Sequence, residues 1–71
     1  MKGKLIVLKG GDTTITENKQ AEAMKLLKEG YQFWTLVEQG QERILGRQVK
    51  PQEIVEEDDV DYIGMRPLAG G

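Results

Sequence analysis

Short apolar runs alternate along this chain with glycine-rich or charged stretches. Lys4–Lys9 holds four consecutive apolar residues between two lysines, which predicts a first strand. Gly10-Gly11-Asp12 is a turn signal, because glycine reaches positive φ without steric cost. Thr13–Thr16 is short and β-branched, so we predict a second strand in a hairpin with the first. The alternative is that Thr13–Thr16 only leads into a helix, since Thr14 and Glu17 fit the spacing of a capping box.

The stretch Glu17–Glu29 predicts a helix, because good helix formers fill it and no residue in it breaks a helix. Either Asn18 or Thr16 has the right chemistry to cap its start, and Gly30 stands where a left-handed residue ends helices. The expected core-facing stripe is narrow. It consists of Gln20, Ala23, Met24 and Leu27, widened by Leu26.

The second half of the chain predicts three more strands. Tyr31–Glu38 is aromatic and β-branched, and both of its alternating faces carry large apolar groups. Glu42–Val49 reads as the return strand after a turn, with Gly46 as a bend or bulge. Pro51–Ile54 resembles one helical turn, with proline at its first position. Val60–Met65 forms a last strand.

The acidic stretch Glu56–Asp59 is expected to be a solvated turn, as short charge runs usually are. It lacks the spacing of a calcium loop. The chain has no cysteine, histidine or serine, which excludes the usual zinc sites and the usual nucleophile–histidine pairs. Gly10-Gly11 lacks the context of a phosphate loop. We therefore expect no metal site, no bound cofactor and no catalytic residue.

Seventy-one residues with 38% hydrophobic content predict one domain with a small core. Ten basic against twelve acidic residues give a net charge of −2, which argues against nucleic-acid binding. No apolar run reaches the length of a membrane span, and none follows a basic start as in a signal peptide. The expectation is a cytoplasmic monomer that contacts neither membrane nor nucleic acid.

The order strand, strand, helix, strand, strand, helical turn, strand is that of a β-grasp fold. Three stretches carry a resemblance to ubiquitin and the prokaryotic sulfur-carrier proteins: Lys28–Gly30, Gly46–Val49 and, above all, Glu57–Ile63 feeding the ending Arg66–Gly71. The resemblance implies an α+β, ubiquitin-like β-grasp fold: a mixed sheet of four to five strands with one helix packed on one face. It also implies a domain over residues 1–65 and a flexible tail over residues 66–71.

By resemblance, the C-terminal Gly70 and Gly71 are the carrier terminus. The carboxylate of Gly71 would be adenylated by an activating enzyme and then pass to a sulfur-transfer enzyme or to an acceptor protein. ATP and magnesium would belong to that enzyme, so this chain would be a carrier and not a catalyst. Two glycines remove every Cβ at the end of the tail, which lets the backbone approach a reaction centre closely.

A partner surface is predicted at Trp34, Met65 and Arg66, because aromatics and arginine are common interface anchors. Alternation alone would bury Tyr31, Phe33 and Val37 and expose Trp34 and Leu36, whereas alignment with the family gives the opposite register. A slip of one residue exchanges the two faces. Burial of Trp34 as plain core therefore stays an open alternative.

A second hypothesis from a different class also remains open. The chain would then be a small, non-enzymatic interaction module, such as a phage or regulatory protein, that binds one macromolecule through its aromatic strand. A third is a β-rich structural subunit that self-associates.

Overall fold

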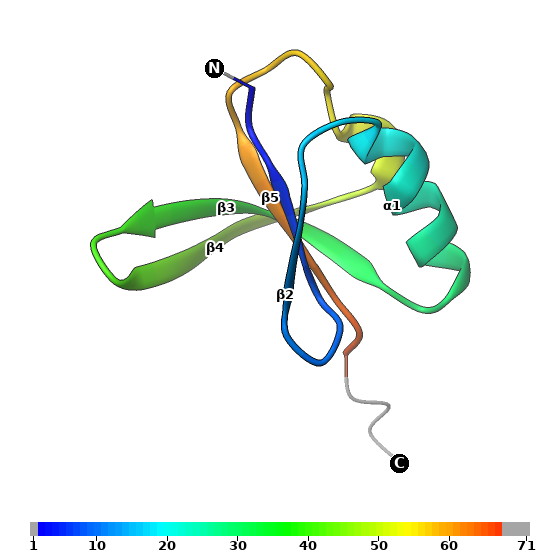
Figure 1. Cartoon of the computed structure of the whole chain (residues 1–71), viewed down its shortest axis with the longest axis horizontal. Helices are drawn as coiled ribbons and strands as arrows, with labels where there is room; N and C mark the ends of the chain where they lie inside the picture. Colours follow the sequence, from blue (N-terminus) through cyan, green and yellow to red (C-terminus); the bar gives the residue numbers. More distant parts are fainter. Residues whose placement is uncertain (1, 68–71) are drawn as a thin grey trace.

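One helix covers one face of a five-stranded mixed sheet in this computed structural model, which describes residues 2–67 (Figure 1). All predicted elements are present, with bounds within two residues of those expected. In chain order they are β1 (Leu5–Leu8), β2 (Asp12–Ile15), α1 (Lys19–Lys28), β3 (Gln32–Gln39), β4 (Glu42–Val49), the 3-10 turn η1 (Pro51–Glu53) and β5 (Asp61–Met65). The protein is therefore an α+β fold.

The strand order in the sheet is β2-β1-β5-β3-β4. The first and last strands, β1 and β5, pair in parallel at its centre, and the other pairs are antiparallel. Ile6 lies opposite Thr14 in the β1–β2 hairpin. The threonine-rich stretch is therefore a strand, and the alternative in which it only leads into the helix is excluded.

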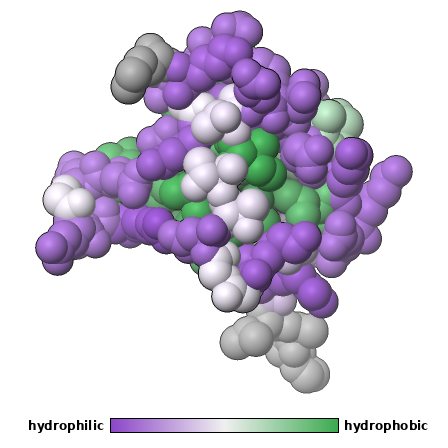
Figure 2. All heavy atoms as spheres, in the orientation of Figure 1, coloured by the Kyte–Doolittle hydropathy of each residue, from purple (hydrophilic) through white to green (hydrophobic). Residues whose placement is uncertain are grey.

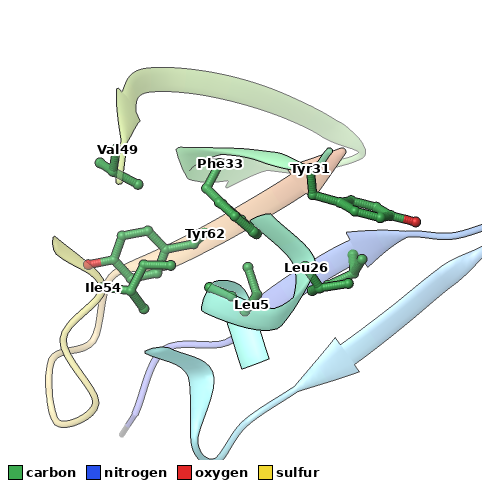
Figure 3. Close-up of a cluster of buried hydrophobic side chains, with 9 residues drawn as sticks. Leu5, Leu26, Tyr31, Phe33, Val49, Ile54 and Tyr62 are labelled. Atoms are coloured by element: carbon green, nitrogen blue, oxygen red, sulfur yellow. The ribbon is translucent and has the colours of Figure 1, made fainter. Parts of the chain in front are cut away.

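The main core lies between α1 and the sheet. Leu5 and Phe33 from the sheet are fully buried there, and Leu26 of the helix packs onto them (Figure 3). Ile54, just after η1, closes one end of this cluster, and Tyr31 lies at the opposite end of the close-up. The other members of this helix-side cluster are Val7, Ala23, Val49 and Tyr62.

The helix meets this core through only part of the stripe that was expected. Ala23 and Leu26 are buried, whereas Met24 and Leu27 are 43% and 49% exposed. The buried stripe continues to Lys19, whose ammonium donates a hydrogen bond of 2.9 Å to the carbonyl of Gly3. The expectation that Met24 and Leu27 face the core was wrong.

The start of α1 is capped by a residue that is remote in the sequence. Asn18 is the N-cap residue, but it adopts a left-handed conformation with φ of 56° and its side chain makes no capping hydrogen bond. The carboxylate of Glu56 instead accepts hydrogen bonds from the amides of Lys19 and Gln20, at 3.0 and 2.9 Å. At the other end Gly30 has φ of 97°, as predicted. The acidic stretch is thus partly structural and not simply solvated.

A second apolar cluster lies on the sheet face that carries no helix. Ile6, Leu36 and Ile63 are only 2–3% exposed there, and Leu8, Trp34 and Met65 pack against them. In Figure 2 apolar residues show on both sides of the pale band where β2 runs, toward α1 and toward the β3–β4 hairpin. We use the name second cluster for the six residues Ile6, Leu8, Trp34, Leu36, Ile63 and Met65.

Strand β3 therefore buries side chains on both of its faces. Tyr31 and Phe33 point to the helix, Leu36 is buried in the second cluster, and Val37 is 49% exposed. The register from alternation alone is right for Tyr31 and Phe33 and wrong for Val37 and Leu36, because it assumed one buried and one open face. Val37 is exposed because it lies opposite Ile44 in the projecting part of the β3–β4 hairpin, where Ile44 is also 43% exposed (Figure 1).

Gly46 lies at an irregularity in the β3–β4 register, as predicted. Pairing shifts by one residue between Trp34 and Leu36. A Cβ at Gly46 would fall on the hydroxyl of Thr35, and the same hydroxyl accepts a hydrogen bond of 3.1 Å from the amide of Arg47. The glycine thus permits the close contact that bends the hairpin.

Candidate functional site

The root of the predicted tail leaves from the centre of the sheet. Strand β5 lies between β1 and β3 and ends at Met65, and Arg66 and Pro67 follow without regular structure. The predicted carrier residues Gly70 and Gly71 lie outside the described residues. What the structure describes is therefore the platform next to the tail, and the boundary between residues 65 and 66 stays a prediction.

Two of the three predicted partner-binding residues lie together on the face opposite the helix. Trp34 pairs with Ile63 across β3 and β5, and Met65 pairs with the neighbouring Gln32. Both Trp34 and Met65 are partly buried and pack against the second cluster. They form a partly exposed apolar surface directly before the tail.

Arg66 lies on the other side. Its guanidinium carbon is 6.0 Å from the centroid of the Tyr31 ring, a distance compatible with a cation–π contact. Tyr31 belongs to the helix-side cluster, whereas Met65 packs in the second cluster. Because successive residues of an extended chain point to opposite faces, Arg66 is separated from Trp34 and Met65 by the sheet.

A chain of opposite charges crosses the same face as the second cluster. Arg43 of β4 forms ion pairs with Asp12 of β2 and with Glu38 of β3, the latter at 3.8 Å. Glu38 in turn contacts the ammonium of Lys4, just before β1, at 2.9 Å. The amide of Lys4 donates a hydrogen bond of 3.0 Å to Asp61 of β5. Strands β1 to β4, or the residues next to them, thus contribute one charged residue each to this ion-pair chain, and β5 joins it through the hydrogen bond between Asp61 and the Lys4 amide.

The ion-pair chain changes the pKa of its members in the directions that mutual attraction requires. The hydrogen bond from Arg43 lowers the pKa of Asp12, and that from Lys4 lowers the pKa of Glu38. The same contact with Glu38 raises the pKa of Lys4. All these side chains are well solvated, so each pair by itself stabilises the fold little.

Two further titrating groups flank the acidic turn. The amide of Gln20, more than that of Lys19, lowers the pKa of Glu56 by donating a hydrogen bond to its carboxylate. Burial raises the pKa of the Tyr62 phenol, and its hydrogen bond of 3.0 Å to Asp58 adds to this effect. Both groups join the turn to the core, so the turn is a poor place for a reactive carboxylate.

Neither a metal centre nor a membrane helix emerges from residues 2–67. In that part of the chain, no three acidic side chains converge closely enough to hold a metal ion. The one helix there, with ten residues, is too short and too polar to cross a bilayer.

The second cluster and the ion-pair chain are the features that the sequence interpretation missed. A signal for the first was present: Leu5–Leu8 is apolar at every position, which is typical of a strand buried on both faces. The ion-pair chain has no comparable signal, because its contacting residues are far apart in the sequence and meet only through the sheet order: Asp12 and Arg43 are separated by 31 positions, and Lys4 and Glu38 by 34.

Comparisons with known proteins assign no family to the chain. It matches no protein-family model, no curated protein sequence and no solved structure.

Proposed function

We propose that this chain is a ubiquitin-like β-grasp carrier or protein modifier. In this proposal the carboxylate of Gly71 is activated by an ATP-dependent partner enzyme, either for sulfur carriage or for amide conjugation. The observation that carries the proposal is the parallel pair of β1 and β5 at the sheet centre, with one helix over one face. A mixed sheet with one helix over one face is the arrangement that the resemblance implies.

The proposed reaction requires only the terminal carboxylate and a recognition surface from the carrier itself. The terminal carboxylate would attack the α-phosphate of ATP and release pyrophosphate, which gives an acyl adenylate on the partner enzyme. A sulfur nucleophile or a thiol of that enzyme would then displace AMP. The carrier contributes a slim, unbranched end at Gly70-Gly71 and a surface by which the enzyme recognises it.

The surface around Trp34 and Met65 supports the recognition step. It is apolar, partly exposed and adjacent to the root of the tail, so an enzyme that holds it also receives the tail. In this proposal Arg66 has a separate role: its contact with the Tyr31 ring orients the first residue of the tail.

The test is a pyrophosphate-exchange assay with candidate activating enzymes, ATP and magnesium, followed by intact-mass analysis of the carrier. We expect exchange and a mass change confined to the residue Gly71. The matched control is the same chain without Gly70-Gly71, whose fold should be unchanged by circular dichroism. Exchange that persists without the two glycines, or no exchange with any candidate, would contradict the proposal.

The alternative function, a non-enzymatic interaction module, is favoured by one observation. Trp34 is only partly buried although it packs on Ile63, so its ring is available to a macromolecular partner. For such a module Trp34→Ala should abolish partner binding, while loss of Gly70-Gly71 should change nothing. Trp34→Ala weakens partner recognition under both hypotheses, so the deletion of Gly70-Gly71 distinguishes them: it abolishes activation of a carrier and leaves binding by a module unchanged.

A further inference from the structure

A groove of about 280 Å³ opens on the helix side of the molecule, where α1, the β3–β4 pair and η1 meet. Its apolar lining comes from Phe33 and Val49 of the sheet, Leu27 of the helix and Pro51 of η1. Phe33 and Val49 are 0% and 4% exposed, whereas Leu27 is 49% exposed. The floor of the groove is therefore part of the buried helix-side cluster, and Leu27 supplies its accessible apolar side.

The rim of this groove is polar and carries one sign of charge. Its polar lining residues are Lys50, Gln32, Gln48 and Gln52, the Gln48 amide donates a hydrogen bond of 3.3 Å to Gln32, and none of the lining residues is acidic. The Lys50 side chain makes no ion pair with another residue of the range 2–67. The other basic residue close by in sequence, Arg47, is held by Glu53 at 2.9 Å. Lys50 is thus an available cation beside an apolar hollow.

We propose that this groove binds a short acidic peptide segment carrying one large apolar side chain. The apolar side chain would fill the hollow against Leu27 and the small exposed part of Val49, above the buried Phe33, and would cover the exposed part of Leu27. A neighbouring carboxylate would pair with Lys50, and the glutamine amides would hydrogen-bond the peptide backbone. The volume suits one or two side chains and lies just below that of sites for drug-sized ligands.

Charge complementarity favours an acidic peptide over a basic or an uncharged one. A basic peptide would bring a second cation next to Lys50, and the carboxylate nearest to Lys50 in sequence, that of Glu53, is already held by Arg47 and by the Lys50 amide. An uncharged apolar segment would leave Lys50 unpaired at the edge of a newly dried contact, which costs desolvation without compensation. The site is independent of Gly70-Gly71 and uses none of the residues assigned to the tail or to the second cluster.

The test uses the full chain labelled with nitrogen-15 and an acetylated, amidated pentapeptide in which two glutamates flank a central leucine on each side. Titration should shift the amide signals of Leu27, Gln48, Lys50 and Gln52 in a saturable way. Lys50→Glu should weaken binding about three- to tenfold, because a solvated attraction becomes a repulsion of similar size. Leu27→Ala should weaken it about tenfold through lost apolar burial.

Three controls make the result decisive. Lys9→Glu makes the same charge change in the β1–β2 turn, outside the groove, and should leave the affinity unchanged within a factor of two or so, as expected for a distant solvated charge. A peptide with lysines in place of the glutamates, and one with alanine in place of the leucine, should both bind at least about tenfold more weakly. Equal binding of the lysine peptide, shifts confined to the Trp34 side, or no saturable shift at millimolar peptide would each overturn the proposal.

Discussion

Asp12 and Arg43 join the two outermost strands of the sheet. The strands β2 and β4 are four positions apart in the order β2-β1-β5-β3-β4. In a flat sheet, strands spaced by about 4.8 Å would place them roughly 19 Å apart, too far for an aspartate and an arginine to meet. The sheet must therefore twist and curl until its edges approach each other over the second cluster. This curl explains how Ile6, Leu36 and Ile63 are buried on a face without a helix.

The variant Arg43→Gln should loosen this curl. It removes the residue that Asp12 and Glu38 share, so the edge strands lose their connection across the face. We expect a small fall in Tm and increased binding of an apolar fluorescent dye to the exposed second cluster. Arg47→Gln is the matched control, because within residues 2–67 Arg47 forms its one ion pair with the nearby Glu53. If both variants behave alike, the edge-to-edge connection has no special role.

The stability of the protein should form a plateau in pH with losses at both ends. The pKa values of Asp12 and Glu38 are lowered in the folded state from their ordinary values of 3.8 and 4.5. Their contribution is therefore present above these ordinary values and is lost as the pH falls through the lower, folded-state pKa. The pKa values of Lys4 and Tyr62 are raised from 10.5 and 10.0, so their contribution is present below these values and is lost as the pH rises further.

Urea unfolding between about pH 2 and pH 11 measures this profile. The double variant Asp12→Asn, Glu38→Gln should be less stable than the parent chain at neutral pH and should lose less stability on acidification. The remaining acid dependence would come from Glu53 and Glu56, whose pKa values are also lowered by hydrogen bonds. An equally steep acid limb in the double variant would show that the ion-pair chain does not contribute.

Glu56→Ala should destabilise the protein by about 1 kcal/mol, the usual loss when a helix start loses its capping group. Both carboxylate oxygens of Glu56 accept amides of the first turn of α1, and Asn18 provides no replacement. Glu56→Gln should recover part of the loss, since one amide oxygen still accepts. Glu57→Ala is the control, because among the described residues Glu57 forms one ion pair, a solvated contact of 3.8 Å with Lys2. Equal losses in Glu56→Ala and Glu57→Ala by denaturant unfolding would refute the capping role.

The order and type of the elements could be predicted because each has a local cause. The Gly10-Gly11 turn, the helix formers after Asn18 and the left-handed Gly30 act on their own neighbourhoods. The cap of α1 could not be predicted, because the residue that provides it, Glu56, lies 37 positions from Lys19. The same limit applies to Lys19, which looks like a surface residue until the carbonyl of Gly3 is placed beside it.

The predicted partner surface shows a second limit of prediction from the sequence, namely which side chains of a strand are exposed. The aromatic strand was correctly found, but its faces were interpreted as one inside and one outside. Leu36 and Trp34 lie on the same face and differ in exposure, since the curl of the sheet covers Leu36 and leaves Trp34 nearer the open end. Arg66 was grouped with Met65 by proximity in sequence, whereas their side chains point to opposite faces of the sheet.

Gly64→Ala should destabilise the protein by about 1–3 kcal/mol, the usual loss on overpacking a dense core. A Cβ at Gly64 would lie 2.6 and 2.7 Å from two carbons of the Phe33 ring, which is fully buried and lies opposite it in the β3–β5 pair. Gly11→Ala is the control: a Cβ there meets no atom within 4 Å. The double variant Gly64→Ala, Phe33→Leu should recover part of the loss, because a smaller side chain relieves the contact. A Gly64→Ala variant as stable as the Gly11→Ala variant would contradict this packing.

Trp34→Ala should separate recognition from chemistry in the proposed carrier. If an activating enzyme holds the Trp34–Met65 surface, the variant should raise KM in the pyrophosphate-exchange assay with little change in kcat, because the tail that reacts is intact. Met65→Gln should act in the same direction, since Met65 packs on the same cluster next to the tail. Val55→Ala is the control, because Val55 is 52% exposed in the loop after η1 and belongs to neither apolar cluster. A fall in kcat with unchanged KM for Trp34→Ala would instead show that Trp34 helps to position the tail for reaction. Unchanged kinetics would show that the activating enzyme does not recognise this face.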